Sequence, residues 1–238
     1  MFSVKIMLNE IEHIYSEVVG TYEIVNHVLT FGLDRTWRRR AARLSARSGG
    51  SRWLDVCSGT GEMAENLIRF APKNVHLTAV DGSFSMLAAA NRKPSLNPIA
   101  LCVSDVNRLP FPSGSFDLIT ISFATRNINP DRRGLSSYLR EFHRILKPGG
   151  YFINLETSQP RNPLLKRLFH FYTRIAVKPV GVLFSGSRAG YEYLAYTLPR
   201  FYSATELSEL IENAGFDCVK FQSLFWGVAA IHSGRKSM

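Results

Sequence analysis

The sequence has few of the residues that mark metal and redox proteins. Its three cysteines, Cys57, Cys102 and Cys218, are too far apart to form a C-x-x-C pair. Zinc and dithiol sites are therefore not predicted, and reduced thiols of a cytoplasmic protein are the expectation. None of the six histidines has a second ligand at metal-binding spacing, so no metal is expected.

Long apolar runs are also missing. No uncharged stretch reaches the roughly 18 apolar residues of a spanning helix. The N-terminus lacks the long apolar core and cleavage site of a signal peptide, which favours a cytoplasmic location. Positive charge, in contrast, is in excess: the net charge is +10, with clusters at 35–47 and 161–178. Nucleic acid, an anionic membrane surface, an acidic substrate or simply a solvated basic face would each account for this charge.

The most ordered pattern is the stretch LDVCSGTGE, from Leu54 to Glu62. A short buried strand is predicted at 53–56, a turn at Gly59-Thr60-Gly61, and a helix from Glu62 to Phe70. A strand, a glycine turn and a helix bring backbone N–H groups and a helix N-terminus close to a ligand. Glycine leaves room for the ligand to approach the main chain. The stretch therefore predicts a binding site for a nucleotide-like cofactor.

Strands and helices alternate after this stretch. Strands are predicted at 75–80, 99–103, 116–121 and 151–155, helices at 83–91, 132–146 and 203–214, and closing strands at 218–223 and 225–232. This rhythm indicates an α/β fold with a seven-stranded, mostly parallel sheet and an antiparallel hairpin at its C-terminal edge. Ligands of such sheets bind at the carboxyl ends of the strands.

Two further segments are predicted to be helical. We expect residues 1–50 to form a lid, with helices at Tyr22–Leu29 and 35–46. Residues 51–238 would form the cofactor-binding domain, with a helical insertion at about 160–200 that is rich in aromatic and basic side chains.

Two cofactors fit the glycine turn. Gly59 to Ala64 also matches the dinucleotide pattern G-x-G-x-x-G/A, and Asp81 lies 20 residues after Gly61, so NAD is a candidate. Asp55 and Asp105 favour S-adenosylmethionine instead, because carboxylates suit its ammonium and sulfonium groups and its adenine amino group. No Tyr-x-x-x-Lys pair for hydride transfer is present. Asp55 and Asp105 could alternatively serve only as caps and turn formers.

Several motifs then follow in a fixed order. They are Asp55–Glu62, Leu109-Pro110-Phe111-Pro112, Ser115-Phe116-Asp117, Ile121–Asn127 with its F-x-x-R-N pattern, and Arg144–Gly150. Together they resemble the ubiquinone/menaquinone biosynthesis C-methyltransferases, which are class I S-adenosylmethionine-dependent methyltransferases. The resemblance extends to both ends, through Tyr22 and Asn26, Trp37-Arg38, Tyr191–Phe201 and Gly227–His232. Glu23, His27, Thr125 and Thr157 depart from the family pattern, which bears on the ring substrate more than on the reaction class.

The resemblance implies a Rossmann-like fold and methyl transfer from S-adenosylmethionine to a ring carbon of a prenylated quinol. It implies cofactor contacts by Asp55, Gly59, Thr60, Gly61, Asp81, Gly82, Asp105, Val106 and Ser122. Arg126 and Asn127 are candidates for stabilising the developing phenolate, and Tyr22 for a hydrogen bond from the lid. A homodimer is expected by analogy only.

The run 164–184 interleaves basic residues with large apolar ones. That composition suits an interfacial helix on anionic lipid, and an apolar lid or a dimer contact would also explain it. The alternative is a methyltransferase of the same fold that acts on another acceptor, such as RNA or a non-quinone lipid or small molecule. Against RNA, no binding module is appended and the aromatics are not spaced as a stacking platform. We therefore expect peripheral membrane contact and no nucleic acid. A degenerate scaffold without activity is the remaining alternative, against which the intact Gly59, Gly61, Asp81, Asp105 and Asn127 argue.

Overall fold

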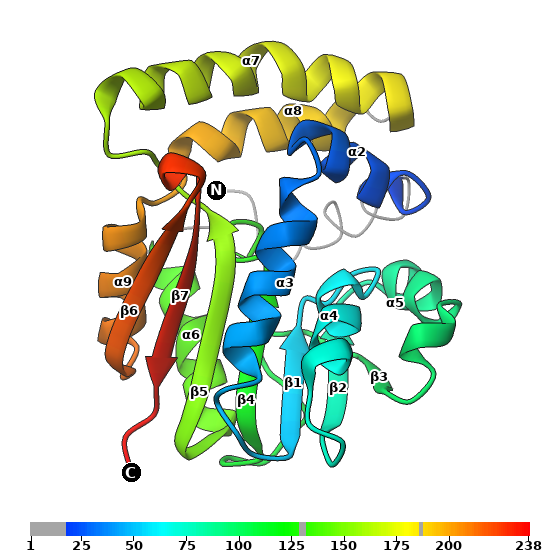
Figure 1. The fold of residues 1–238 in the computed structure, drawn as a ribbon, viewed down its shortest axis with the longest axis vertical. Coiled ribbons are helices and arrows are strands. Elements are labelled where there is room, and N and C mark those ends of the chain that lie inside the picture. Colours follow the sequence, from blue (N-terminus) through cyan, green and yellow to red (C-terminus); the bar gives the residue numbers. More distant parts are fainter. Residues whose placement is uncertain (1–17, 129–131, 186–187) are drawn as a thin grey trace.

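A computed structural model describes residues 18–128, 132–185 and 188–238. The predicted start of the N-terminal lid, before residue 18, lies outside the described residues. Figure 1 shows one sheet with helices on both faces and a third group of helices across its upper edge.

The sheet has seven strands in the order β3-β2-β1-β4-β5-β7-β6. Neighbouring pairs among β1 to β5 run parallel, whereas β7 is antiparallel to both β5 and β6. This topology confirms the predicted sheet and its edge hairpin. The strands are β1 (Arg52–Val56), β2 (His76–Asp81), β3 (Ala100–Val103), β4 (Phe116–Ser122), β5 (Leu146–Thr157), β6 (Asp217–Leu224) and β7 (Ala229–Arg235).

The α-helices are α2 (Tyr22–Leu29), α3 (Leu33–Ser45), α4 (Glu62–Phe70), α5 (Phe84–Asn91), α6 (Arg132–Ile145), α7 (Pro163–Ser185), α8 (Arg188–Thr197) and α9 (Ala204–Asn213). Short 3-10 turns are η1 (Pro94–Leu96), η2 (Leu198–Arg200) and η3 (Phe225–Gly227). Two helices have side-chain caps: the Ser83 hydroxyl accepts a hydrogen bond from the N–H of Met86, and Ser203 forms a capping box with Glu206.

The two faces of the sheet are covered by different helices. Successive strand residues point to opposite faces, so Leu54 packs with Phe142 of α6, whereas its neighbour Trp53 packs with Ala41 of α3 and Leu67 of α4. The strands read as nearly continuous apolar runs because both faces are buried.

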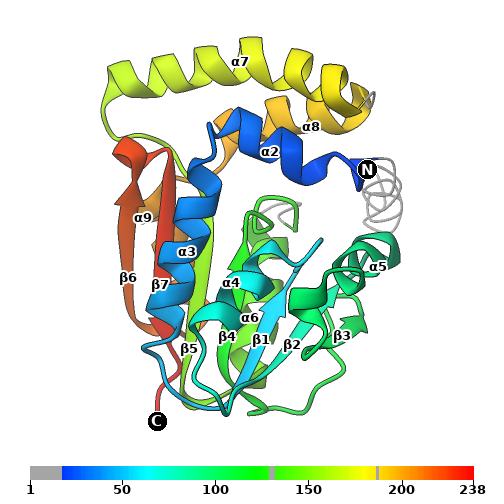
Figure 2. The same ribbon diagram turned by 45° about the vertical axis from the view of Figure 1, so that its right-hand side comes forward.

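A smaller core holds the upper group of helices together. It joins Val25 of α2 to Val177 of α7 and Tyr191 of α8. Gly181 lets α7 and α8 approach closely, because a Cβ there would lie 2.0 Å from the Tyr191 ring. Figure 2 shows this group lying across the carboxyl ends of the strands, where ligands of such sheets bind.

Two predicted boundaries are wrong. The segment Lys147-Pro148-Gly149-Gly150 lies between the helix predicted at 132–146 and the strand predicted at 151–155. It belongs to β5, which begins at Leu146 and shifts register against β4 between Phe116 and Leu118. An irregular strand of this kind can accommodate proline and glycine. The last strand begins at Ala229, not Phe225, because residues 225–227 form η3.

Candidate active site

The two glycines of the turn are needed for different structural reasons. Gly61 has φ +84°, and a Cβ there would lie 2.3 Å from Leu96 Cδ1 of η1. Gly59 has φ +56°, but its Cβ would meet nothing within 4 Å. Gly61 therefore permits close packing of η1, whereas Gly59 leaves space open beside the turn.

Asp81 ends β2 and is fixed by main-chain donors. The N–H of Gly59 donates to its Oδ2 at 2.7 Å and the N–H of Ser83 to its Oδ1 at 2.8 Å. Burial raises the pKa of the Asp81 carboxyl, and these hydrogen bonds oppose the rise. Asp105 follows β3, and its Oδ1 accepts from the N–H of Asn107 at 2.8 Å. Each carboxylate oxygen keeps a lone pair for a ligand hydroxyl or amino group.

The cavity beside the turn, here the turn cavity, encloses about 280 Å³. Carboxylates dominate its charge, because Glu62, Asp81 and Asp105 all line it. Of the other sequence-predicted cofactor residues, the wall includes Gly59, Thr60, Gly82, Val106 and Ser122. The buried hydroxyl of Ser122 has no hydrogen-bond partner among the described residues, so the wall offers a donor to a ligand.

Asp55 and Gly61 do not line this cavity. Asp55 is buried beneath the turn, where the Thr120 hydroxyl donates to its Oδ1 at 2.6 Å. Its Oδ2 has no partner within the described part of the chain. Burial raises the pKa of the Asp55 carboxyl to about 7. The structure thus places this carboxylate behind the wall, within reach of the turn backbone.

A second cavity of about 390 Å³, here the apolar cavity, lies between the upper helices and the strand ends. Side chains of α2, α7, α8 and η3 form its mostly apolar wall. It is long and lined with rings and aliphatic groups, for example Leu29, Phe169, Tyr172, Val177 and Leu194. Such a space suits a large apolar molecule.

Arg126 is the main cation on the wall of the apolar cavity near the β4 end. It is buried, its Nη1 donates to Thr197 Oγ1 at 2.7 Å, and its backbone N–H donates to Glu156 Oε2 at 3.1 Å. Its Nε has no partner, and it forms no ion pair with the residues described here. A buried guanidinium that forms no ion pair stabilises an anion placed beside it.

Three residues line both cavities and mark where they meet: Tyr22, Arg38 and Asn127. Tyr22 comes from α2, Arg38 from α3, and Asn127 from the turn after β4. Burial raises the pKa of the Tyr22 hydroxyl, and the Arg38 charge opposes this rise. The structure therefore brings two of the three predicted catalytic residues to the junction, and Arg126 to the apolar side of it.

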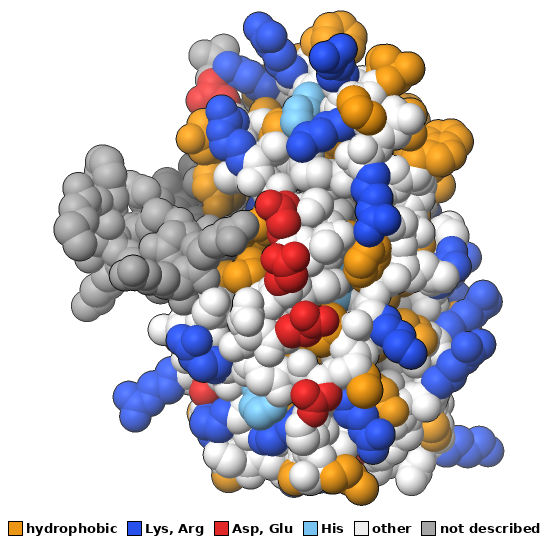
Figure 3. Space-filling view, turned by 90° about the vertical axis from the view of Figure 1, so that its left-hand side faces the viewer, with side chains coloured by type: hydrophobic (Ala, Val, Ile, Leu, Met, Phe, Trp, Pro, Cys, Tyr) orange, Lys and Arg blue, Asp and Glu red, His pale blue; other side chains and the backbone are white. Residues whose placement is uncertain are grey.

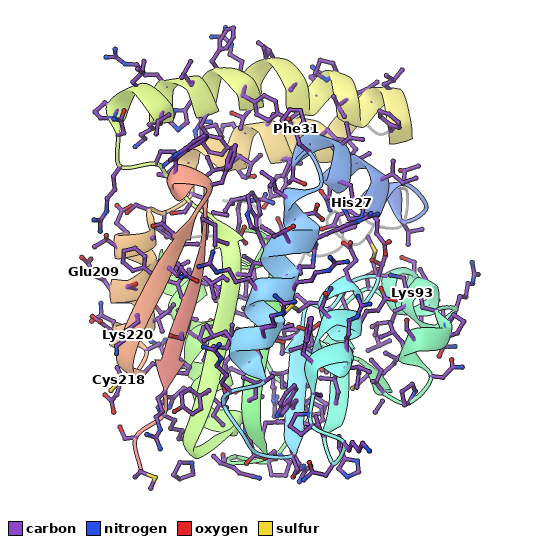
Figure 4. All side chains as sticks on the ribbon, viewed as in Figure 1. His27, Phe31, Lys93, Glu209, Cys218 and Lys220 are labelled. Carbon is purple, nitrogen blue, oxygen red and sulfur yellow. The ribbon has the colours of Figure 1, made fainter. Side chains whose placement is uncertain are left out.

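The role of Arg38 was missed from the sequence, although the Trp37-Arg38 signature contains it. Its guanidinium is buried and binds Asp34 at 2.7 Å and Glu62 at 3.0 Å. His27 Nδ1 and Asp34 Oδ2 are 2.7 Å apart, so the cluster ties α2 and α3 to the first residue of α4. Glu23, His27 and Glu62 have ligand atoms within 4.8 Å of one another, but Lys93 and Arg38 already pair with the two carboxylates. Figure 4 shows His27 above the sheet and Lys93 beside α5.

Comparison with known proteins identifies this arrangement. A model of the ubiE/COQ5 methyltransferase family matches residues 4–236. The chain belongs to that family. It is therefore a methyltransferase, as the motifs from Asp55 to Gly150 indicated.

Curated relatives match this methyltransferase over nearly their whole length. The ubiquinone/menaquinone biosynthesis C-methyltransferase UbiE of Geobacter sulfurreducens is 36% identical, over 96% of this chain and 89% of its own. The demethylmenaquinone methyltransferase of Staphylococcus saprophyticus is 34% identical, over 95% of this chain and 96% of its own.

A solved structure shares the fold. It is the SAM-dependent methyltransferase, possible histamine N-methyltransferase, of Thermotoga maritima, with a TM-score of 0.63 and 21% identity over 94% of this chain and 99% of that chain. The Rossmann-like class I fold of this methyltransferase is thus confirmed.

Proposed function

We propose that this methyltransferase transfers a methyl group from S-adenosylmethionine to a ring carbon of a prenylated quinol in respiratory quinone biosynthesis. The observation that carries the proposal is the meeting of an acidic cavity and an apolar cavity at Tyr22, Arg38 and Asn127. The family and the names of the relatives support the same class of acceptor.

The turn cavity fits S-adenosylmethionine. The carboxylates of Asp81 and Asp105 suit ribose hydroxyls and an adenine amino group, and Gly59 and Gly82 allow the main chain to be approached. The negative wall, completed by Glu62, suits a ligand with two cationic groups. When bound, the cofactor supplies an activated methyl group on a sulfonium. A dinucleotide is disfavoured, because its pyrophosphate would face the carboxylate-rich wall.

The acceptor ring would lie at the junction, with its prenyl tail in the apolar cavity. A ring carbon becomes nucleophilic when the neighbouring hydroxyl loses its proton. The guanidinium of Arg126, which forms no ion pair among the described residues, would lower the pKa of that hydroxyl and stabilise the phenolate. Thr197 holds Arg126 in place through the 2.7 Å hydrogen bond.

Tyr22 and Asn127 would orient the ring at the junction. Tyr22 stays protonated, because burial raises its pKa, and so can donate a hydrogen bond to the acceptor oxygen. Asn127 would hold the same oxygen or a water. Holding the ring carbon in line with the methyl group supplies much of the acceleration, since effective molarities can reach roughly 10⁵ M.

We further propose that residues 1–50 and the insertion at about 160–200 act together as the cover of the site on the domain 51–238. The shared core of Val25, Val177 and Tyr191 supports this arrangement. Lys93 Nζ lies 2.7 Å from Glu23 Oε1 and 3.1 Å from Glu65 Oε2, which ties α2 to the body beside the turn cavity. Closing the cover would exclude water from the junction.

The acceptor class also implies a location, and we propose a cytoplasmic protein bound peripherally to an anionic membrane. No helix among the described residues has the length and apolarity to span a bilayer. On α7, Leu164, Leu168, Phe171 and Ile175 are exposed and follow a spacing of four, three and four residues, which forms one outward stripe. Such a stripe with basic neighbours suits the interface of a bilayer.

The test is transfer of a labelled methyl group into demethylmenaquinol and the benzoquinol precursor, side by side. Transfer into one of them is expected, and transfer into neither would overturn the acceptor class. Arg126→Ala should abolish turnover while S-adenosylmethionine still binds with a near-normal Kd by calorimetry. Arg200→Ala, which changes an exposed arginine of η2 that lines neither cavity, is the matched control. Near-normal turnover of Arg126→Ala would overturn the role of Arg126.

A further inference from the structure

The apolar cavity has a rim of exposed aromatic and aliphatic side chains. Among the residues that line it, Phe31 is 78% exposed, Trp226 72% and Leu168 55%. They come from three segments far apart in the sequence: the turn after α2, η3 and α7. Because the same side chains touch both the cavity and the solvent, the cavity opens between them. Figure 4 shows Phe31 at the upper end of the molecule, beneath α7.

The backbone at this rim is strained. Phe31, Phe225 and Trp226 have φ of +53°, +42° and +54°, in the left-handed region that non-glycine residues rarely adopt. Gly227 follows with φ +93°, and a Cβ there would lie 3.3 Å from Pro160 Cα, so η3 sits against the start of the insertion. Strain of this kind persists where the surrounding structure imposes it, and it is concentrated at functional sites. Here it presents large rings to the outside.

The rim is continuous with the outward stripe of α7. Leu168 belongs to both, since it lines the cavity and also lies on the stripe with Leu164, Phe171 and Ile175. The Phe31 ring contacts Tyr172 of α7 with centroids 6.0 Å apart, and the Tyr172 hydroxyl donates to the carbonyl of Leu29 at 2.7 Å. The mouth of the cavity and the stripe therefore form one apolar surface.

The charged side chains that α7 contributes around this surface are all basic. The helix carries the basic residues Lys166, Arg167, Arg174 and Lys178 and no aspartate or glutamate. On the face shown in Figure 3, Lys, Arg and hydrophobic side chains gather at the upper end, and most of the carboxylates lie lower down. Each basic group beside an anionic lipid surface adds about as much attraction as a surface ion pair. Long basic side chains can reach the headgroups while their aliphatic stems lie in the apolar layer.

We propose that the rim of Phe31, Leu168, Phe225 and Trp226 inserts into the apolar layer of an anionic bilayer. The mouth then opens directly into the lipid, and a prenyl tail slides into the cavity without crossing water. This inference rests on the proposed function for the nature of the tail. The occupant is lipid and not a second copy of the chain, because two copies would bring the basic flanks of α7 against each other.

The chain has a natural probe for this surface. Of its three tryptophans, Trp37 and Trp53 are 7% and 0% exposed, so Trp226 alone can be reached from outside. Vesicles of phosphatidylglycerol and brominated phosphatidylcholine should quench the fluorescence of the full chain. Trp226→Phe should abolish the quenching and still co-sediment with the vesicles.

Two variants measure how much the rim side chains contribute to vesicle binding. Trp226→Ser and Phe31→Ser should each weaken vesicle binding roughly tenfold, as expected for the loss of one inserted aromatic ring. Phe84→Ser, which removes an equally exposed ring on α5, should leave vesicle binding unchanged. Figure 2 shows α5 away from α7.

Unquenched fluorescence on vesicles that bind the protein would overturn the proposal, as would equal vesicle binding of all three variants. If the molecular mass in solution doubles as the protein concentration rises, if Trp226→Ser prevents this doubling, and if vesicles do not quench the fluorescence, the surface binds a second copy of the chain. That result would also overturn the proposal. Methyl transfer by the wild type to a water-soluble quinol analogue with a short tail tests the proposed function separately. Failure there with normal quenching would overturn the acceptor class and leave the lipid contact standing.

Discussion

Arg38 Nη2 lies 3.0 Å from Glu62 Oε2, and this contact joins α3 to the first residue after the glycine turn. The guanidinium also binds Asp34 and lies 4.9 Å from the centroid of the Phe123 ring, which follows β4. Phe123 has φ +55°, so the ring is held in an uncommon backbone conformation at the strand end. Arg38 therefore connects the lid, the turn and the end of β4.

Replacing Arg38 should destabilise the protein strongly. In Arg38→Gln the buried carboxylates of Asp34 and Glu62 lose their cation, and loss of one partner of a buried ion pair costs about 3 kcal/mol or more. Urea unfolding measures the change, with the exposed neighbour variant Arg39→Gln as control, which should change stability by about 0.5 kcal/mol or less. Adding Glu62→Gln should restore part of the loss, because one unpaired charge is removed. A strictly additive double variant would contradict the pairing.

The two glycines of the turn should respond differently to alanine. Gly61→Ala should lower stability more, since its Cβ would lie 2.3 Å from Leu96 Cδ1, whereas Gly59→Ala should mainly weaken cofactor binding, because its Cβ projects into open space beside the turn cavity. The positive φ alone costs about 1 kcal/mol at either site. Thermal unfolding and calorimetry with S-adenosylmethionine separate the two effects. Leu96→Ala should partly rescue Gly61→Ala, and the absence of any coupling would argue against the packing explanation.

Asp55 should make the ligand-free protein less stable as pH rises. Burial raises the pKa of its carboxyl to about 7, above its ordinary value of 3.8, so the folded state holds a proton that the unfolded state has released. The stabilisation by that proton is complete below about pH 4 and is lost as pH rises through about 7, and it amounts to up to about 4 kcal/mol. Asp55→Asn, which carries no charge, should therefore match the wild type near about pH 3 and exceed it by a margin that grows up to about pH 8 in urea unfolding. An offset that is the same at both pH values would contradict this.

His232 should have the opposite effect over nearly the same range. Burial lowers the pKa of its imidazole to about 4, and its Nε2 lies 2.9 Å from the carbonyl of Ala204. The unfolded state then binds more protons, so stability is lost as pH falls from about 6.5 to about 4, by up to about 3 kcal/mol.

The prediction is checked by measuring the free energy of unfolding of His232→Gln as a function of pH. This variant should lack the loss of stability at acid pH, and His76→Gln, at an exposed histidine, is the control. In the wild type the contributions of Asp55 and His232 largely cancel between about pH 4 and about pH 7. Each single variant should thus expose the slope of the other group, and a flat profile in both would rule out the cancellation.

Most of the sheet could be predicted from the sequence, because each strand is a short apolar run bounded by turn residues. The helix Tyr22–Leu29 and the capping box at Ser203 followed from local chemistry in the same way. The start of β5 was not predicted, since Pro148 and the two glycines after it are typical of a turn. Residues 147–150 have no partner in the β4 register, and the backbones of Gly149 and Gly150 hydrogen-bond to Lys236 instead.

The candidate site was predictable where one side chain sits at one strand end. Asp81, Asp105 and Arg126 follow that rule. The role of Arg38 was not predicted, because it depends on Asp34 and Glu62. These two residues belong to different helices, and sequence spacing cannot show that they meet. The strained rim at Phe31 and Trp226 was not predicted for a similar reason. No local sequence pattern predicts a tryptophan in the left-handed region of backbone conformation. The resemblance implies cofactor contacts by Asp55 and Gly61, whereas neither residue lines the turn cavity.

The walls of the two cavities are encoded in different parts of the chain. The described wall of the turn cavity is complete between Tyr22 and Tyr138, whereas the apolar cavity draws much of its wall from Glu156 to Val228. If the two cavities hold the acceptor and the methyl donor as proposed, substitutions, insertions or exchange of that one contiguous segment alter what is methylated without changing the groups around the methyl donor. An ancestral gene with this layout could acquire new acceptors in a single recombination event and still remain a methyltransferase.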